Sequence, residues 1–405
     1  MGSILFSVTT FFLSLANLAS CERINHEFIY PNHTSSYFQF IDANGVFLRS
    51  RNGTFNAAFF NPGRQQSKYY LCILHSTSQT VIWSASRDSP FSKSIRLFLS
   101  PQGIAVTDKI SSGAVTVKWS TQPLNSSVAA MQLTETGNLA LLDQFNRSIW
   151  QSFDQPTDTI VIGQQLPVGK SLVSSLSDSD YSSGDFQFSV DTYDGLLEWK
   201  GSNYWKISME QNAFVNSNAP ISFMALNGTG LYFYGENGSV VVLQVILSPS
   251  EFRIAKLGFG GQFTISSLSF RSTTYEFMAP KDICRIPYIC GLIGLCTTVT
   301  SSGQYSCSCP SGFQNINQGC FPSDASLSLP SACNDTDSVQ SSTVSYTSLV
   351  FCNPNFSFLL DFFTVVFLII EHSSEVRPYK GATGGLCTAV FILEVDSQEP
   401  ICIIK

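Results

Sequence analysis

Three short segments that contain tryptophan recur within the first 155 residues, and they limit the fold more than any other feature. They are VIWS around Trp83, VKWS around Trp119 and SIWQS around Trp150, spaced by 36 and then 31 residues. The loops between them, SPQGIAVTD and TETGNLALLD, also resemble one another. A repeat of this length is a unit too small to bury its own apolar face, so its copies pack together. We therefore expect the three tryptophans to lie in a common core.

The side-chain pattern around these segments predicts β-strands. Residues alternate up to Leu133, turn at Thr136-Gly137-Asn138, and resume as an apolar run that leads to Trp150. Only 13% of residues are charged, whereas phenylalanine alone occurs 33 times. Aromatic and β-branched side chains pack well on pleated surfaces, so the composition favours an all-β fold. The net charge of −7, without a long basic run, gives nucleic acid no electrostatic footprint.

One long segment, GNLALLD…SIWQSFDQPTDTIVIGQQL, closely resembles the signature of bulb-type lectin domains in plant S-domain (G-type lectin) receptor kinases and S-locus glycoproteins. The resemblance covers about residues 30–330. It implies a β-prism II lectin domain at 22–160, in which three four-stranded sheets place their tryptophans about a pseudo-threefold axis. It further implies a second, S-locus glycoprotein-like β-domain at 161–280 and an EGF-like module at 281–321.

The N-terminus predicts secretion. Residues 1–21 have an apolar core from Ile4 to Leu18 and small residues for cleavage at Ala19-Ser20, which is typical of a signal peptide. A membrane anchor is the alternative, but the apolar run is shorter than the roughly 20 residues that a span needs. Twelve cysteines and eight glycosylation sequons point to an oxidising, extracellular location. The sequons begin at Asn32, Asn52, Asn125, Asn146, Asn227, Asn237, Asn334 and Asn355.

Six cysteines crowd into the segment at 284–320, with the spacing C-x5-C-x5-C-x10-C-x-C-x10-C. Arithmetic alone permits fifteen pairings. A zinc site competes with disulfides, but no histidine is near and the compartment is oxidising. The resemblance to EGF-like modules implies the pairs Cys284–Cys296, Cys290–Cys307 and Cys309–Cys320. Cys72 stands alone in an apolar strand, and we expect a buried free thiol.

The tail at 322–405 departs from the family pattern, which continues with a PAN module and, in receptors, a membrane span and a kinase. Four further cysteines could form a degenerate PAN remnant, and no kinase motif is present. The apolar run at 357–370 could anchor the chain in the plasma membrane, but it is short and Asp361 interrupts it. We favour a buried strand pair or an aberrant spliced end, and expect the tail after Leu349 to be unrelated to the family fold.

The resemblance also indicates a carbohydrate site. The mannose pocket of bulb lectins follows the motif Q-x-D-x-N-x-V-x-Y, whose alternating side chains face one groove. The positions of this chain that match the motif are Thr134, Thr136, Asn138, Ala140 and Leu142. Only Asn138 keeps the motif residue, and after Gly137 an asparagine also suits a turn. In the preceding repeat Ile104 lies near the asparagine position.

We find no catalytic constellation, metal site or cofactor motif. Asp154 and Asp158 could be a glycosidase pair, but they flank Pro156 and suit a turn. We therefore expect a secreted or cell-surface, non-catalytic recognition protein. Its expected partner is a carbohydrate, a glycoprotein, a receptor-kinase ectodomain or a second copy. The alternatives are an active mannose-type lectin and an ectodomain fragment of an S-domain receptor-like kinase.

Overall fold

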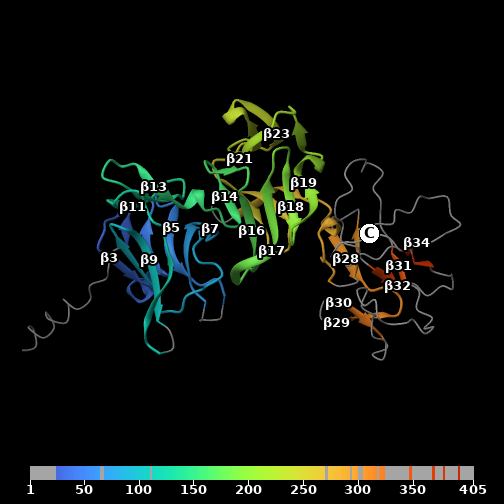
Figure 1. Ribbon diagram of the computed structural model, residues 1–405, viewed down its shortest axis with the longest axis horizontal. Coiled ribbons are helices and arrows are strands. Elements are labelled where there is room, and N and C mark those ends of the chain that lie inside the picture. The colour runs from blue at the N-terminus through green and yellow to red at the C-terminus, as the bar shows by residue number, and fades with distance from the viewer. Residues whose placement is uncertain are drawn as a thin grey trace, which may run out of the picture.

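The computed structural model describes residues 24–323, apart from 64–67, 110–111, 270–271, 292–293, 300–303 and 317–318, together with four short strands of the tail. Figure 1 shows three successive β-bodies, coloured blue to cyan, green to yellow and orange along the chain. We refer to them as the first body, the second body and the disulfide module. The predicted signal peptide at 1–21 lies outside the described residues.

The first body consists of three sheets, in agreement with the three tryptophan repeats. The first sheet has the order β1-β4-β5-β6-β7, with strands Asn25–His26, Val46–Arg49, Phe55–Phe60, Tyr70–His75 and Val81–Ser84. The second has the order β10-β9-β8-β3, with strands Val115–Ser120, Gly103–Lys109, Arg96–Ser100 and His33–Ser36. The third has the order β13-β12-β11-β2, with strands Ser148–Gln151, Leu139–Leu142, Ala130–Leu133 and Phe28–Ile29. Two 3-10 turns accompany them, η1 (Tyr37–Ala43) and η2 (Ser152–Asp154).

Each sheet contributes one tryptophan to a common centre, as predicted. Trp83 on β7, Trp119 on β10 and Trp150 on β13 lie with their ring centroids 6.1 to 6.2 Å apart and their planes 70 to 74° apart. Edge-to-face aromatic pairs contribute about 0.5–1.5 kcal/mol beyond their buried area. The indole N–H of Trp83 donates to the carbonyl of Gln155 at 2.8 Å, so its polar atom is satisfied at the centre.

The second body also contains three sheets, and strands from distant parts of the sequence pair within them. One has the order β14-β24-β25-β26, with strands Thr159–Val161, Arg253–Leu257, Phe263–Ser269 and Ser272–Ala279. Another has the order β15-β21-β22-β23-β20, with strands Gln165–Pro167, Ile221–Asn227, Gly230–Gly235, Val240–Ile246 and Ala213–Val215. The third has the order β16-β17-β18-β19, with strands Ser171–Ser177, Asp180–Val190, Gly195–Trp199 and Ser202–Lys206. The 3-10 turns are η3 (Ile207–Met209) and η4 (Glu236–Gly238).

Phenylalanines take the central place in the second body. Phe188 on β17 stacks on Phe263 on β25, with ring centroids 4.3 Å apart and planes 13° apart. A Cβ at Gly195 would lie 2.8 Å from the Phe188 ring and 2.9 Å from Phe233, so only glycine fits beside them. Because these residues belong to no repeated motif, the sequence pattern did not indicate this centre.

The two β-bodies are joined through buried polar contacts. The Arg87 guanidinium, which follows β7, donates to the carbonyls of Tyr181, Val173 and Ser174 at 2.6, 2.7 and 2.6 Å. Its side chain is buried, and burial lowers the pKa of the guanidinium. The first core also includes Val161 and Ile254 of the second body. Because the first core extends into strands of the second body, it sets no sharp limit at residue 160, and the domain limits at 160 and 280 remain predictions.

A second contact between the bodies is an ionic cluster at Asp180. Lys68 forms an ion pair with the Asp180 carboxylate, and the Tyr70 hydroxyl donates to it at 3.1 Å. The hydrogen bond from Lys68 holds the pKa of Asp180 well below its usual range. Burial, with the charge of Asp180 second, raises the pKa of Tyr70 to about 12. Because Asp180 of the second body binds two side chains of the first, these contacts stabilise one relative orientation of the two bodies.

The disulfide module begins with η5 (Ile283–Arg285) and contains two hairpins, β27 (Leu295–Val299) with β28 (Gln304–Ser308) and β29 (Phe313–Ile316) with β30 (Gly319–Pro322). Disulfides join Cys284 to Cys296, Cys290 to Cys307, and Cys309 to Cys320, which are the pairs that the resemblance implies. A module of this size has too little apolar surface to fold by burial alone, so the bridges stabilise it. Cys72 in the first body is a buried free thiol, as expected, and burial raises its pKa.

In the tail the structure describes two strand pairs, β31 (Tyr346–Ser348) with β32 (Phe367–Ile369) and β33 (Arg377–Pro378) with β34 (Phe391–Ile392). The rest of the predicted PAN remnant, including its cysteines and most of the run at 357–370, lies outside the described residues. Among the residues that are described, we find no helix with the length and hydropathy of a membrane span.

We predict that Arg87→Ala lowers the free energy of unfolding by about 2–4 kcal/mol, because three buried carbonyl oxygens lose their donor. Chemical denaturation followed by tryptophan fluorescence measures the change. The exposed Arg96 on β8 provides the control, since Arg96→Ala should change the same quantity by no more than about 0.5 kcal/mol. Equal effects of the two substitutions would contradict the bridging role.

His75 makes the stability pH-dependent. Its ring is buried and stacks on Phe252 of the second body, with centroids 4.8 Å apart, and this burial lowers its pKa. The unfolded chain binds a proton at His75 near pH 6.5, whereas the folded chain resists it. The stability contribution is therefore complete above about pH 6.5 and decreases as the pH falls toward the lowered pKa.

We accordingly predict that the free energy of unfolding decreases between pH 7.5 and 5.5 and that His75→Phe weakens this dependence. Denaturation curves at several pH values test it. An unaltered slope in the His75→Phe protein would contradict the assignment.

Candidate functional site

The candidate carbohydrate residues lie together on the hairpin of β11 and β12. The turn between the strands is closed by hydrogen bonds from the Thr134 N–H to the Asn138 carbonyl, 2.9 Å, and from the Gly137 N–H to the Thr134 carbonyl, 3.1 Å. Gly137 has a φ of 87°, and a Cβ there would lie 2.6 Å from the Ile82 side chain. A side chain would therefore be strained as well as crowded, so the turn requires glycine.

Internal hydrogen bonds occupy the Asn138 side chain. Its amide oxygen accepts from the Ser152 hydroxyl and the Phe153 N–H, each at 3.2 Å. Its amide nitrogen donates to the Gln151 side chain at 2.8 Å. These partners belong to β13 and η2, so Asn138 ties the turn to the next strand and its 3-10 turn. The geometry favours the structural role over direct contact with a sugar.

The other motif positions offer few polar atoms. The Thr134 and Thr136 hydroxyls lie 2.9 Å apart and bind each other. Ala140 and Leu142 are buried, with 4% and 7% of their surface exposed. Ile104, near the asparagine position of the preceding repeat, is also buried. Sugar recognition needs several convergent hydrogen-bonding groups, and this strand presents two short hydroxyls.

Asp154 and Asp158, which we expect to serve a turn and not a glycosidase site, are both engaged in local contacts. Asp154 accepts from the Gln151 side chain at 3.0 Å. Asp158 is buried, accepts from Thr159 at 2.8 Å and lies 3.5 Å from the Lys256 ammonium group. Both carboxylates thus stabilise local structure. In the part of the chain that the structure describes, no cluster of three His, Cys, Asp or Glu side chains could hold a metal ion.

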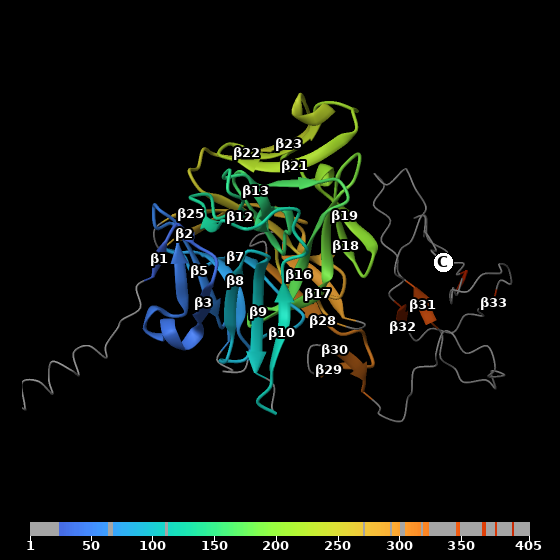
Figure 2. The ribbon, with the colours of Figure 1, turned by 60° about the vertical axis from the view of Figure 1, so that its left-hand side comes forward.

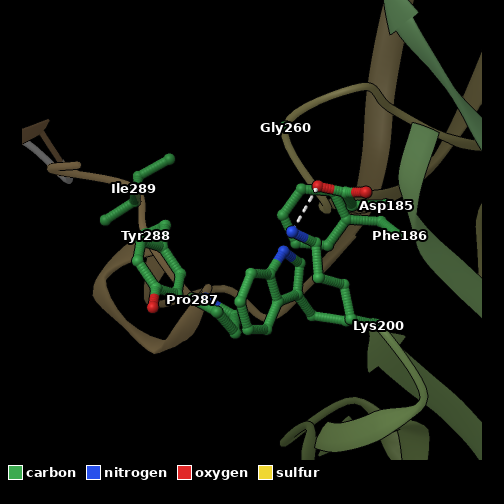
Figure 3. Close-up of a pocket in the computed structure, with 8 residues that line it drawn as sticks. Asp185, Phe186, Lys200, Gly260, Pro287, Tyr288 and Ile289 are labelled. Atoms are coloured by element: carbon green, nitrogen blue, oxygen red, sulfur yellow. Dashed lines mark ion pairs between the residues drawn. The ribbon is translucent and has the colours of Figure 1, made fainter. Parts of the chain in front are cut away.

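A cavity of about 500 Å³ lies where the second body meets the disulfide module. Figure 3 shows Tyr288 and Ile289 of the module on one side and Asp185, Lys200 and Gly260 of the second body on the other. It is lined by Asp185, Phe186, Trp199, Lys200, Gly260, Pro287, Tyr288 and Ile289. No sequence pattern indicates this cavity, because its residues come from segments far apart in the chain.

Aromatic rings and one ion pair give this cavity its chemistry. The Trp199 and Tyr288 rings lie 4.6 Å apart, and the Lys200 ammonium lies 5.0 Å from the Trp199 ring centroid. Lys200 also forms an ion pair with Asp185 at 3.4 Å. Apolar rings beside a few polar groups can hold an apolar or aromatic side chain of a protein, or the ring of a sugar. The only sequence signals here are the tryptophan of GLLEWK and the tyrosine between two cysteines.

The described sequons all lie near the surface. The asparagines at 32, 52, 125, 146 and 237 are exposed, and Asn227 is half-buried. The remaining two sequons, at Asn334 and Asn355, lie outside the described residues. Which of them carry glycans remains a prediction.

The three sheets of the first body and their shared tryptophan centre define a lectin-type recognition fold, and comparisons with known proteins agree. The D-mannose binding lectin family matches residues 80–177. The G-type lectin S-receptor-like serine/threonine-protein kinase At5g35370 of Arabidopsis thaliana is 45% identical over 313 residues, which cover 76% of this chain and 36% of the relative. A second Arabidopsis kinase of this type, SD2-5, is 27% identical, with the same coverage of both chains.

The chain belongs to the G-type lectin S-receptor-like family, and it spans about a third of the length of the curated relatives that it matches. Among solved structures, a two-domain fetuin-binding lectin of Scilla campanulata is 13% identical. The match covers 55% of this chain and 89% of that one, with a TM-score of 0.23. A TM-score this low supports no inference.

We predict that Asn138→Ala destabilises the protein by about 1–3 kcal/mol, because the Phe153 N–H loses its acceptor and the side-chain oxygen of Gln151 loses its donor. Thermal denaturation measures the loss. The control is Thr136→Ala, since Thr136 is exposed and its hydroxyl bonds to that of Thr134 on the same turn. An affinity for mannose that disappears in a stable Asn138→Ala protein would contradict the structural role.

Proposed function

We propose that this chain is a secreted or cell-surface recognition protein that binds a protein or glycoprotein partner and catalyses no reaction. The observation that carries this proposal is that the predicted mannose motif on the turn before β12 and on β12 presents few free polar groups. The three sheets of the first body are formed, but Asn138 is engaged internally and Ala140 and Leu142 are buried. A scaffold that keeps its shape without the polar groups of its sugar site is suited to recognition through other surfaces.

The cavity between the second body and the disulfide module is the best candidate for that contact. Tyr288 lies between Cys284 and Cys290, which are each held in a disulfide, so ordering it on binding costs little entropy. Buried aromatic anchors carry much of the energy in protein interfaces. We propose that Trp199 and Tyr288 bind an apolar or aromatic side chain of the partner and that Asp185 and Lys200 orient it.

A second candidate is that the chain represents the extracellular part of a longer S-domain receptor-like kinase. The observation that favours it is the alignment of 76% of this chain with 36% of a receptor-like kinase. In that case the partner would be a ligand or a second receptor ectodomain. The two candidates share the same binding surfaces and differ in whether the protein continues beyond this chain into a kinase domain.

The proposal predicts that the glycosylated protein, produced in a plant host, co-purifies with a protein from the membrane fraction. It also predicts that the purified protein shows no mannose-dependent binding on a glycan array. Trp199→Ala and Tyr288→Ala should each weaken partner binding by about tenfold or more, the effect of losing one interface anchor. Tyr275→Ala is the control, because Tyr275 is exposed on β26 outside the cavity lining. Mannose binding that survives both cavity substitutions would overturn the proposal in favour of an active lectin.

A further inference from the structure

A row of aromatic rings covers the outer face of the sheet that contains β21 and β22. Figure 2 shows these strands at the top of the second body. Phe223 on β21 stacks on Tyr234 on β22, with centroids 5.2 Å apart, and Tyr234 stacks on Tyr232 at 6.0 Å. The alternate residues of the same strands, such as Met224 and Phe233, point into the core. The three rings remain partly exposed, so the row is available for a ligand.

A glycosylation sequon lies at each end of this row. Asn227-Gly228-Thr229 begins at the last residue of β21 and supplies the two-residue turn before β22. Asn237-Gly238-Ser239 lies in and after η4, at the other end, where a Cβ on Gly238 would be in ordinary contact with the Phe223 ring at 3.4 Å. Two acceptor sites thus flank three stacked rings.

The Asn227 side chain is held with its amide next to the rings. Its oxygen accepts from the Thr229 N–H, the Thr229 hydroxyl and the Gly230 N–H at 2.8, 2.9 and 3.0 Å. The Thr229 hydroxyl is also 2.8 Å from that of Tyr232. A hydrogen bond from Asn227 to Tyr234 partly offsets the rise that burial causes in the pKa of this tyrosine. Both tyrosines therefore lean from β22 toward the sequon.

A small residue, Ala225, leaves space beside this amide. Ala225 is paired with Tyr232, lies between Phe223 and Asn227 along β21, and has only a methyl group. The partner of Asn227 across the hairpin is Gly230, which adds no side chain to the row because a Cβ there would lie 2.1 Å from the Val245 carbonyl oxygen. A sugar linked to the amide nitrogen can therefore lie along the row instead of pointing away. The C–H groups on one face of a pyranose ring are attracted to the negative face of an aromatic ring.

We propose that Asn227 carries an N-linked glycan whose first N-acetylglucosamine packs on Tyr232 and Tyr234, so that the chain's own sugar covers this sheet face. The linkage forms during synthesis, when the Asn227 amide nitrogen bonds to the anomeric carbon of a polyprenyl-pyrophosphate-linked oligosaccharide. The bond from that carbon to the pyrophosphate breaks, polyprenyl pyrophosphate leaves, and the amide loses one proton. The inference rests on the proposed secretion.

The first test is occupancy. The chain is produced in a plant host, and glycopeptides are identified by mass spectrometry. Glycans at Asn227 and at other sequons are expected. If no sequon is occupied, the proposed secretion fails and this inference fails with it. If the other sequons are occupied and Asn227 is not, the inference is overturned and the proposed secretion stands.

The second test measures the contact. Asn227→Gln also removes the turn hydrogen bonds and the bond from Asn227 to Tyr234, so it is compared in two backgrounds, with Tyr234 intact and with Tyr234→Ala, and each comparison is repeated on chains whose glycans have been removed enzymatically. The glycan-dependent Tm loss is the loss that Asn227→Gln causes in the glycosylated chains minus the loss that it causes in the deglycosylated chains. It should be about 2–4 °C larger with Tyr234 intact than with Tyr234→Ala. Trimming the glycan to one N-acetylglucosamine should preserve this difference, because only the first sugar touches the rings.

Asn52 provides a matched control, because its sequon is also Asn-Gly-Thr and its oxygen likewise accepts from the threonine N–H two residues on, at 3.0 Å. Asn52→Gln should lower the Tm equally in both Tyr234 backgrounds. In the spectrum of the trimmed, isotope-labelled glycoprotein, sugar protons at Asn227 should show ring-current shifts that disappear in Tyr234→Ala. An occupied Asn227 without such shifts and without the Tm difference would overturn the packing.

Discussion

Three indole rings that meet edge to face organise the first body. Each belongs to a different sheet, so the contact can form only when all three sheets are in place, and loss of one ring leaves the other two beside a void. The hydrogen bond from Trp83 to the carbonyl after η2 further ties this centre to the segment that enters the second body. The core, the exit of the chain and the position of the second body therefore depend on one packing arrangement.

The junctions between bodies determine where the protein can present recognition surfaces. Arg87 and the cluster around Asp180 connect the first and second bodies by polar contacts with several partners each. The disulfide module meets the second body through the Trp199–Tyr288 contact and the cavity beside it. Because both junctions combine distant segments, small changes in the loops can alter the surface while the sheets stay the same.

On β12, the residues that the fold requires differ from the residues that a sugar site would require. Alternation places Leu139 and Leu141 in the core, and this requirement is satisfied whatever residues occupy the opposite side. The positions predicted to match the sugar motif hold short or apolar side chains, and β11 and β12 pair without interruption beside them. The aromatic row near Asn227 follows similar logic: its inner side belongs to the core, and its outer side is free to acquire another role, which we assign to the chain's own glycan.

The sequence by itself determined the all-β class, the three tryptophan units and the turn at Gly137, because alternation and glycine signals act over a few residues. The disulfide pairs and the lectin resemblance came from a longer motif. Only the tertiary structure decided that Asn138 is engaged internally, that phenylalanines form the second centre, and that Trp199 approaches Tyr288. These features depend on the side chains of strands far apart in the chain, whose meeting no local pattern encodes.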